Sequence, residues 1–388
     1  MRVLILSTPE STHFTTMVPL AWALRGAGHE VLVAGQPDIV PTARAAGLCT
    51  VTVGREFHAK DLLSPPLPPG RRPIEVTGPT TPKMIAIGSK VWVLHARYLF
   101  PRYLEVAHQF KPDLVVSEQM DYAALLVGGV RKIPVVSHRW GIDPLSPLMR
   151  ETAVEFLQGT CDRYGIEGGL PLPDVVLDPA PPELLYPGTP QATPIRHVPY
   201  NGTGPVPERL RRTGDKPRVV VSMGRQTIAL GGLPMFRTMI EAFGQLPDIE
   251  AVFTVQDEYI EPLGPAPANV WLTPPVPLNG FLGTCAAIVH HGGANTLMTA
   301  TGAGVPQLVL PQLADQFAGG ELLAATDAAI SLGTADEQND PAIVADALST
   351  LLDGERFVKG AAELARSVAA MPSPAAVVRD LENLRCAS

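Results

Sequence analysis

The sequence predicts an α/β protein with two doubly wound parallel sheets, each in its own domain. Three observations lead to this prediction. At 388 residues the chain is long for a single hydrophobic core. Short, fully apolar runs alternate with stretches of helical pattern, as in parallel sheets that helices cover on both faces. The alternation stops in a stretch rich in proline and glycine, at 186–217, and then resumes.

In the first half, strands are expected wherever an apolar run of strand length ends in polar or turn residues, at 3–7, 30–35, 113–117 and 134–138. The stretch from about 15 to 27 has apolar residues at one-face helical spacing, and the glycines near its end stop the helix. A second helix is expected between the third and fourth strands. Residues 54–82, rich in proline and glycine, are expected to form a mobile loop.

The second half repeats the pattern, with strands expected at 218–224, 250–255, 269–273, 286–291, 306–311 and 328–333. We therefore divide the chain into an N-terminal domain (1–200), a linker (201–217) and a C-terminal domain (218–388). The last helix is a candidate to pack back on the N-terminal domain. Sheets of this kind bind ligands at the carboxyl ends of their strands, so the expected site is a cleft between the domains.

Composition disfavours several classes of protein. The net charge of −8 argues against a nucleic-acid partner, which needs clustered Lys and Arg. The four cysteines are far apart and form no CxxC pair, so a disulfide framework is disfavoured and a reducing cytoplasm is expected. The apolar run near the start is too short for a signal peptide, and no apolar run is long enough to cross a bilayer.

The segment HHGGANT follows an expected strand and precedes an expected helix. Its two histidines are neighbours, so on a strand they point to opposite faces, which disfavours a shared metal ion. A helix that begins at Gly292 or Gly293 exposes unpaired backbone N–H groups, to which Asn295 and Thr296 add side-chain donors. An anion cradle with His291 at its edge is one interpretation, and a plain strand-to-helix turn is the other.

Three longer segments resemble one enzyme family. HHGGANTLMTATGAGVPQLVLPQLADQF resembles the donor-binding signature of inverting nucleotide-sugar glycosyltransferases with the two-domain GT-B fold. THFTTMVPLAWALRGAGHEVLVAG and VPLNGFLGTCAAIVHHGG are similar to actinobacterial enzymes that attach deoxysugars to polyketide and macrolide antibiotics. The resemblance is weak through 54–110 and 145–200. It implies two Rossmann-like domains facing each other across a cleft, the first binding the acceptor and the second the nucleotide sugar.

The resemblance also implies which residues bind the donor. The family's signature histidine and the helix after it hold the diphosphate, and these positions match His291, Gly293, Asn295 and Thr296. The family's Asp-Gln pair, which binds sugar hydroxyls, matches Asp315 and Gln316.

The family's base-binding loop matches 275–278. Val276 is expected to contribute backbone contacts there, because this sequence has proline where plant relatives have a stacking tryptophan. Arg225, in the turn after a strand, is a candidate to reach the phosphates, with an exposed loop arginine as the alternative. The nucleotide sugar, with TDP as the expected carrier, is a co-substrate, so the resemblance implies no cofactor and no metal.

The family's catalytic histidine matches His13, which is expected between the first strand and the first helix. A neutral imidazole there can act as a general base, and the positive end of the helix favours the neutral form. Glu118 matches the partner carboxylate of plant relatives, with Asp121 as the alternative. His138 and Trp140 are candidates to line the acceptor pocket, with a role in the core as the alternative for each.

We therefore expect inverting transfer of a deoxysugar from a TDP-sugar to a hydrophobic acceptor such as a polyketide aglycone. C-glycosylation of an aromatic polyketide and a non-catalytic homologue are alternatives within the same fold. A dinucleotide oxidoreductase would need a GxGxxG turn after the first strand, where the sequence reads STPESTHF. A homodimer and the need for an auxiliary protein stay open.

Overall fold

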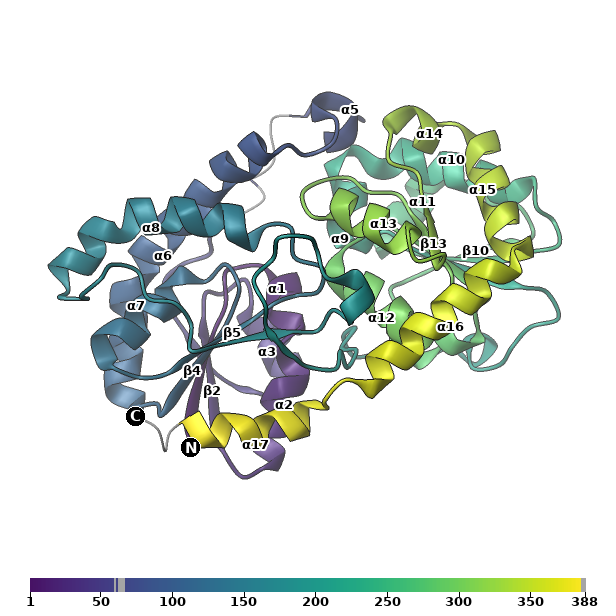
Figure 1. Cartoon of the computed structure of the whole chain (residues 1–388). Helices are drawn as coiled ribbons and strands as arrows, with labels where there is room; N and C mark the ends of the chain where they lie inside the picture. Colours follow the sequence, from purple (N-terminus) through teal and green to yellow (C-terminus); the bar gives the residue numbers. More distant parts are fainter. Residues whose placement is uncertain (59–60, 62–66, 385–388) are drawn as a thin grey trace.

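The structure of the protein, a computed structural model, describes residues 1–58, 61 and 67–384. The described residues form two sheets, one in each half of the chain (Figure 1). The first has the strand order β3-β2-β1-β4-β5-β6-β7 and the second the order β10-β9-β8-β11-β12-β13. Every described strand pair is parallel. The predicted α/β class with two doubly wound domains is confirmed.

The strands are short and mostly apolar. The first sheet consists of β1 (Arg2–Leu6), β2 (Glu30–Gly35), β3 (Cys49–Thr52), β4 (Leu114–Glu118), β5 (Val135–His138), β6 (Val175–Asp178) and β7 (Thr193–Pro194). The second consists of β8 (Arg218–Ser222), β9 (Glu250–Thr254), β10 (Val270–Thr273), β11 (Ala287–His290), β12 (Gln307–Val309) and β13 (Ala329–Ser331). Their central strands are apolar on both faces because helices cover both faces of each sheet.

Helices enclose the first sheet from two sides. One face packs against α1 (Ser11–Thr15), α2 (Val18–Gly26) and α3 (Val40–Ala45). The other face packs against α6 (Pro82–Phe110), α7 (Tyr122–Arg131) and α8 (Ser146–Arg163). Alternate residues of β1 show the division, because Val3 and Ile5 join the first cluster and Leu4 and Leu6 join the second.

The second sheet is covered in the same way. One face packs against α10 (Leu233–Gly244), α11 (Asp257–Leu263) and α15 (Pro341–Asp353). The other packs against α12 (Ala294–Ala303), α13 (Gln316–Ala324) and α16 (Glu355–Ala370). Two short helices, α9 (Gly224–Thr227) and α14 (Ala335–Asn339), and a π-helical turn, η3 (Ile228–Gly232), lie in its connections.

Helix α17 (Pro374–Leu384) returns to the first domain and packs against α2 (Figure 1). Its Val377, Val378 and Leu381 are buried in the core of that domain. At its end, Glu382 Oε1 lies 2.9 Å from His29 Nε2. The chain therefore joins the two domains both through the linker and through its C-terminal helix.

The helix expected at 15–27 is present as α2, which begins at Val18, where Pro19 in the first turn favours a helix start. One expectation about the first domain is wrong. The stretch 54–82 is not simply a loop, because it contains α5 (Pro73–Thr77) and the buried side chain of Arg72. Residues 59–60 and 62–66 of that stretch lie outside the described residues.

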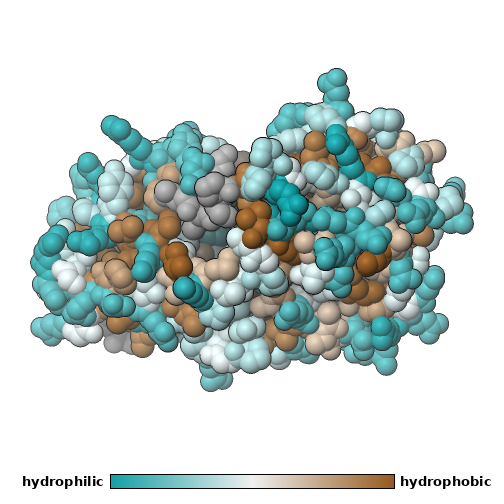
Figure 2. Space-filling view, turned by 90° about the horizontal axis from the view of Figure 1, so that it is seen from above, coloured by the Kyte–Doolittle hydropathy of each residue, from teal (hydrophilic) through white to brown (hydrophobic). Residues whose placement is uncertain are grey.

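The surface is mixed in character. Seen from above, hydrophilic residues cover most of both lobes, and hydrophobic residues form scattered patches between them (Figure 2). Among the helices that the structure describes, none has the length and apolar character needed to cross a membrane.

Candidate active site

His13 lies in the short helix that follows β1, and two tryptophan rings flank it. Its ring stacks on Trp140 with 3.8 Å between centroids and 22° between planes, and Trp92 meets it edge-on at 5.8 Å. Burial lowers the pKa of His13 from 6.5 to about 3, so its imidazole is neutral at neutral pH. The expectation that His13 precedes the helix is wrong, and desolvation accounts for the neutral form.

Thr8 lies between His13 and Glu118, with its hydroxyl near the histidine and its backbone N–H near the carboxylate. Thr8 Oγ1 is 2.7 Å from His13 Nδ1. Glu118, buried at the end of β4, accepts hydrogen bonds from the backbone N–H of Thr8 (3.2 Å) and of Met120 (2.8 Å). Glu118 therefore reaches His13 through Thr8, which corrects the expected direct pairing.

Asp121, the alternative carboxylate, has a structural contact. It caps α7 by accepting a hydrogen bond at Oδ1 from the backbone N–H of Ala123 (3.0 Å). Burial raises the pKa of Glu118 to about 7, and burial together with Glu118 raises the pKa of Asp121 to about 8. These neighbouring carboxyl groups therefore titrate as a pair near neutral pH.

Of the two expected acceptor residues, Trp140 lies beside His13 and His138 does not line the same space. His138 is buried and borders a small cavity of about 10 Å³ together with Thr16 and His197. The strand ends at His138, and the chain leaves the sheet before Trp140. Its burial favours the core role, which was one of the two alternatives for His138.

At the end of β11, the two adjacent histidines have different surroundings, as expected for neighbours on a strand. His290 is fully buried. Its Nε2 pairs with Gln307 Oε1 at 2.8 Å, and its Nδ1 accepts a hydrogen bond from the backbone N–H of Gly292 at 2.9 Å. This histidine is packed between sheet and helix.

His291 is partly buried, and its ring lies between two glycines. A Cβ at Gly224 would lie 2.7 Å from His291 Cε1, and a Cβ at Gly293 would lie 2.4 Å from His291 Nε2. Gly224 also has a φ of +70°, which favours glycine. Sequence reasoning missed Gly224, although a glycine in the turn after an apolar strand was a signal for such a close approach.

Helix α12 begins at Ala294, directly after Gly293. Its N-cap, Gly293, makes no side-chain cap hydrogen bond, so the first backbone N–H groups keep their capacity to bind an anion. The side chain of Asn295 donates from Nδ2 to the carbonyl oxygen of Tyr200 (2.9 Å) and ties the helix to the last residue of the first domain. This side-chain N–H of Asn295 therefore binds the protein backbone and not the expected diphosphate. Thr296, in the first turn of the helix, is partly exposed.

Residues 140–142 connect His13 with this helix. A Cβ at Gly141 would lie 3.1 Å from Met298 Cγ and 3.5 Å from Ala294 Cβ, both in α12. The adjacent Trp140 stacks on His13. The candidate base and the start of the helix therefore flank one short segment of the first domain, and Gly141 permits the close approach.

Asp315 and Gln316 stand where the loop after β12 meets α13, and side-chain hydrogen bonds hold this loop. Gln316 Oε1 accepts from the backbone N–H groups of Gln312 (2.9 Å) and Leu313 (3.2 Å). Burial raises the pKa of Asp315 to about 7, and the charge of Asp143 adds to this increase. Gln316 therefore shapes the loop that presents Asp315.

The remaining donor candidates lie on the second domain. Val276 is partly buried and packs against the cluster that contains Leu278 and Phe281. Arg225 belongs to α9, but its side chain lies outside the part of the chain that is described. Their contacts with a nucleotide stay predictions.

Comparison with known proteins places the chain in a family. The model of the N-terminal domain of erythromycin biosynthesis protein CIII-like proteins matches residues 22–224, and that of the C-terminal domain matches 237–384. Tylactone mycaminosyltransferase of Streptomyces fradiae is 31% identical over 99% of this chain and 92% of its own. TDP-daunosamine transferase DnrS of Streptomyces peucetius is 32% identical over 99% of this chain and 97% of its own.

Solved structures agree. Spinosyn rhamnosyltransferase SpnG, also solved in complex with thymidine diphosphate, has a TM-score of 0.88 and 37% identity over 99% of this chain and 100% of its own. Glycosyltransferase VinC in complex with dTDP has a TM-score of 0.84 and 28% identity over 100% of both chains. The expected GT-B arrangement is thereby confirmed. The chain belongs to the erythromycin biosynthesis protein CIII-like family of actinobacterial antibiotic glycosyltransferases.

Proposed function

We propose that this glycosyltransferase moves a deoxysugar from a TDP-sugar to a hydrophobic, polyketide-type acceptor, with inversion and without a metal ion. The observation that carries the proposal is the junction at 140–142. There Trp140 stacks on His13, and Gly141 packs against the first turn of α12. A single displacement needs a general base and stabilisation of the leaving diphosphate, and the junction lies between a candidate for each.

In the proposed step, His13 Nδ1–H donates to Thr8 Oγ1, which leaves Nε2 free of its proton. Nε2 takes the proton of the acceptor hydroxyl, and the acceptor oxygen bonds to the anomeric carbon. The bond from that carbon to the diphosphate breaks, and its electron pair leaves with TDP. The N–H groups of α12 and the His291 ring stabilise the diphosphate charge. One displacement inverts the anomeric carbon.

Two kinds of observation support the substrate classes. Trp92 and Trp140 give the surroundings of His13 an aromatic surface, which favours an apolar acceptor. Among the relatives, SpnG has been solved with spinosyn aglycone and with thymidine diphosphate, and VinC with dTDP. In this mechanism, Asp315 and Gln316 bind the donor sugar. Val276 and Arg225 bind the rest of the nucleotide.

Ligand-induced stabilisation and a transfer assay test the proposal. TDP should raise Tm more than UDP, because a ligand that binds the folded state shifts unfolding by mass action. TDP-sugars with polyketide aglycones should then give a glycoside with the inverted anomeric configuration. The rate should be the same in EDTA. A chain that TDP does not stabilise, or activity that EDTA abolishes and Mg²⁺ restores, would contradict the corresponding part.

His13→Ala tests the base. It should lower kcat by roughly 10² to 10⁴, the usual contribution of general-base catalysis, while TDP affinity stays within a few-fold of wild type. The control is His58→Ala, which removes an exposed histidine. Near-normal turnover of His13→Ala would remove this assignment.

A further inference from the structure

Residues 71–80 of the first domain, here called the docking segment, lie against the second domain. The segment includes α5, which reaches toward α10 and α14 (Figure 1). Its Arg72 is only 1% exposed, and a guanidinium this buried needs hydrogen-bond partners for its N–H groups and a compensating charge. Glu75 of the same segment supplies the charge, with its Oε1 3.6 Å from Arg72 Nη2. Side chains of the other domain supply hydrogen-bond acceptors.

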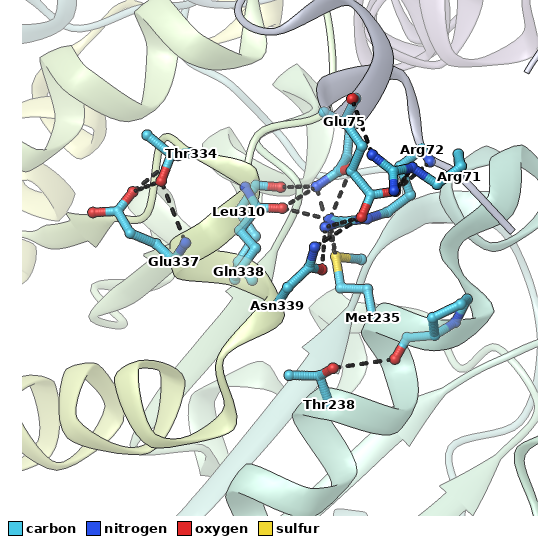
Figure 3. A network of polar contacts seen from close by, with 12 residues as sticks. Arg71, Arg72, Glu75, Met235, Thr238, Leu310, Thr334, Glu337, Gln338 and Asn339 are labelled. Atoms are coloured by element: carbon cyan, nitrogen blue, oxygen red, sulfur yellow. Dashed lines mark hydrogen bonds and ion pairs between the residues drawn. The ribbon is translucent and has the colours of Figure 1, made fainter.

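The Arg72 guanidinium points into a group of side-chain oxygens (Figure 3). Its Nη1 donates to Gln338 Oε1 (2.6 Å) and to Gln312 Oε1 (3.2 Å), and its Nη2 donates to Asn339 Oδ1 (2.6 Å). Glu75, in the docking segment itself, accepts from Asn339 Nδ2 (2.8 Å). One side chain of the first domain thus connects α14 with the loop after β12.

The backbone of the second domain is shaped for this contact. Gly231, in the π-helical turn η3, has a φ of +81°, and a Cβ there would lie 2.2 Å from the carbonyl oxygen of Arg71. Any side chain at this position would displace the docking segment. The close approach and the conformation both require glycine.

The docking segment holds the loop 312–316 at two points. Gln312 accepts from Arg72, and the backbone N–H of Ala314 donates to Thr80 Oγ1 at 2.7 Å. Ala314 has a φ of +53°, a left-handed conformation that a residue with a Cβ adopts only when its surroundings impose it. The residue after it is Asp315.

We propose that Arg72 and Thr80 are positioning residues for the donor sugar. They fix the loop 312–316 from the acceptor-side domain and so set where Asp315 and Gln316 meet the sugar hydroxyls. This inference rests on the proposed function, because it takes Asp315 and Gln316 as the sugar-binding pair. The diphosphate lies at a different element, α12, and does not depend on the docking segment.

Thr80→Val tests the inference with little change of shape. The control is Thr77→Val, because the Thr77 hydroxyl donates to the Pro73 carbonyl oxygen (2.9 Å) within the same segment and contacts no part of the loop. Thr80→Ser keeps the hydroxyl. An Arg72 variant is less informative, because it removes a buried donor from Gln312, Gln338 and Asn339 at once and can lower the stability of the whole fold.

The full-length chain is titrated with TDP and with TDP-rhamnose, and amide hydrogen exchange is followed over 312–316. Thr80→Val should weaken TDP-rhamnose binding roughly two- to tenfold, as expected for one hydrogen bond, and speed exchange at Ala314. TDP affinity should change less than twofold, and Thr80→Ser and Thr77→Val should resemble wild type.

Equal weakening of TDP and TDP-rhamnose in Thr80→Val would overturn the inference, because the segment would then act on the whole nucleotide site. Identical affinities in Thr80→Val and Thr77→Val would also overturn it. A wild-type chain that binds no TDP would instead refute the proposed function. A wild-type chain that binds both ligands, with Thr80→Val unchanged, would refute the positioning role alone.

Discussion

Thr8 is the residue that completes the connection between the base and its carboxylate. Its hydroxyl contacts His13 Nδ1 at 2.7 Å, and its backbone N–H contacts Glu118. Thr8→Val should lower kcat by roughly two- to tenfold with KM little changed, because one hydrogen bond that orients the imidazole is lost. Thr8→Ser should restore the rate. The control is Thr15→Val, which removes a hydroxyl hydrogen bond within the short helix that carries His13, and an equal loss in both valine variants would contradict the role of Thr8.

Glu118 gives the protein a pH-dependent stability. Burial raises its pKa from 4.5 to about 7, so the folded chain binds this proton more tightly than the unfolded chain. The contribution is complete below pH 4.5 and is lost as the pH rises through 7, by up to roughly 3 kcal/mol. Urea unfolding at a series of pH values should show a flatter decline for Glu118→Gln than for wild type.

The matched control for this measurement is Glu155→Gln, at an exposed position of α8. It should keep the wild-type decline in unfolding free energy between pH 4.5 and 7. If Glu118→Gln also keeps that decline, the raised pKa of Glu118 is wrong. If Asp121→Asn removes it instead, the proton resides mainly on the other carboxyl group.

The elements differ in how well sequence alone predicts them. β1 and β8 are apolar runs bounded by polar residues, and a doubly covered strand leaves this signal. β7 has two exposed residues at a sheet edge, so it leaves none. In α6, exposed Leu94 and Tyr98 lie among buried apolar residues, so the one-face pattern that marks a helix is blurred.

The candidate site residues also differ in how well sequence alone predicts them. His13 and His291 could be proposed from the sequence because one follows the first expected strand, the other ends a later one, and both stand within family motifs. Thr8 and Gly141 could not, because their importance comes from what lies beside them in space: the His13 ring for one and α12 for the other. The docking of Arg72 depends on contacts more than 160 residues away in the sequence, which no local pattern encodes.

As a whole molecule, the protein assembles its candidate site from both domains. The linker contacts α12 through Asn201, the C-terminal helix packs on α2, and the docking segment holds the loop 312–316. The first and third connections contact α12 and the loop 312–316, which carry candidate substrate-binding residues. The second contributes to the core of the first domain. Several separate contacts therefore position the candidate acceptor and donor regions relative to each other.

The central claim is that the diphosphate of the donor binds where His291 meets the start of α12. Calorimetry of TDP and thymidine with wild type and His291→Ala tests it most directly. Loss of a hydrogen bond to a charged group should weaken TDP binding by roughly ten- to 150-fold and leave thymidine binding nearly unchanged. Unchanged TDP affinity in the folded variant would contradict the claim and place the phosphates elsewhere.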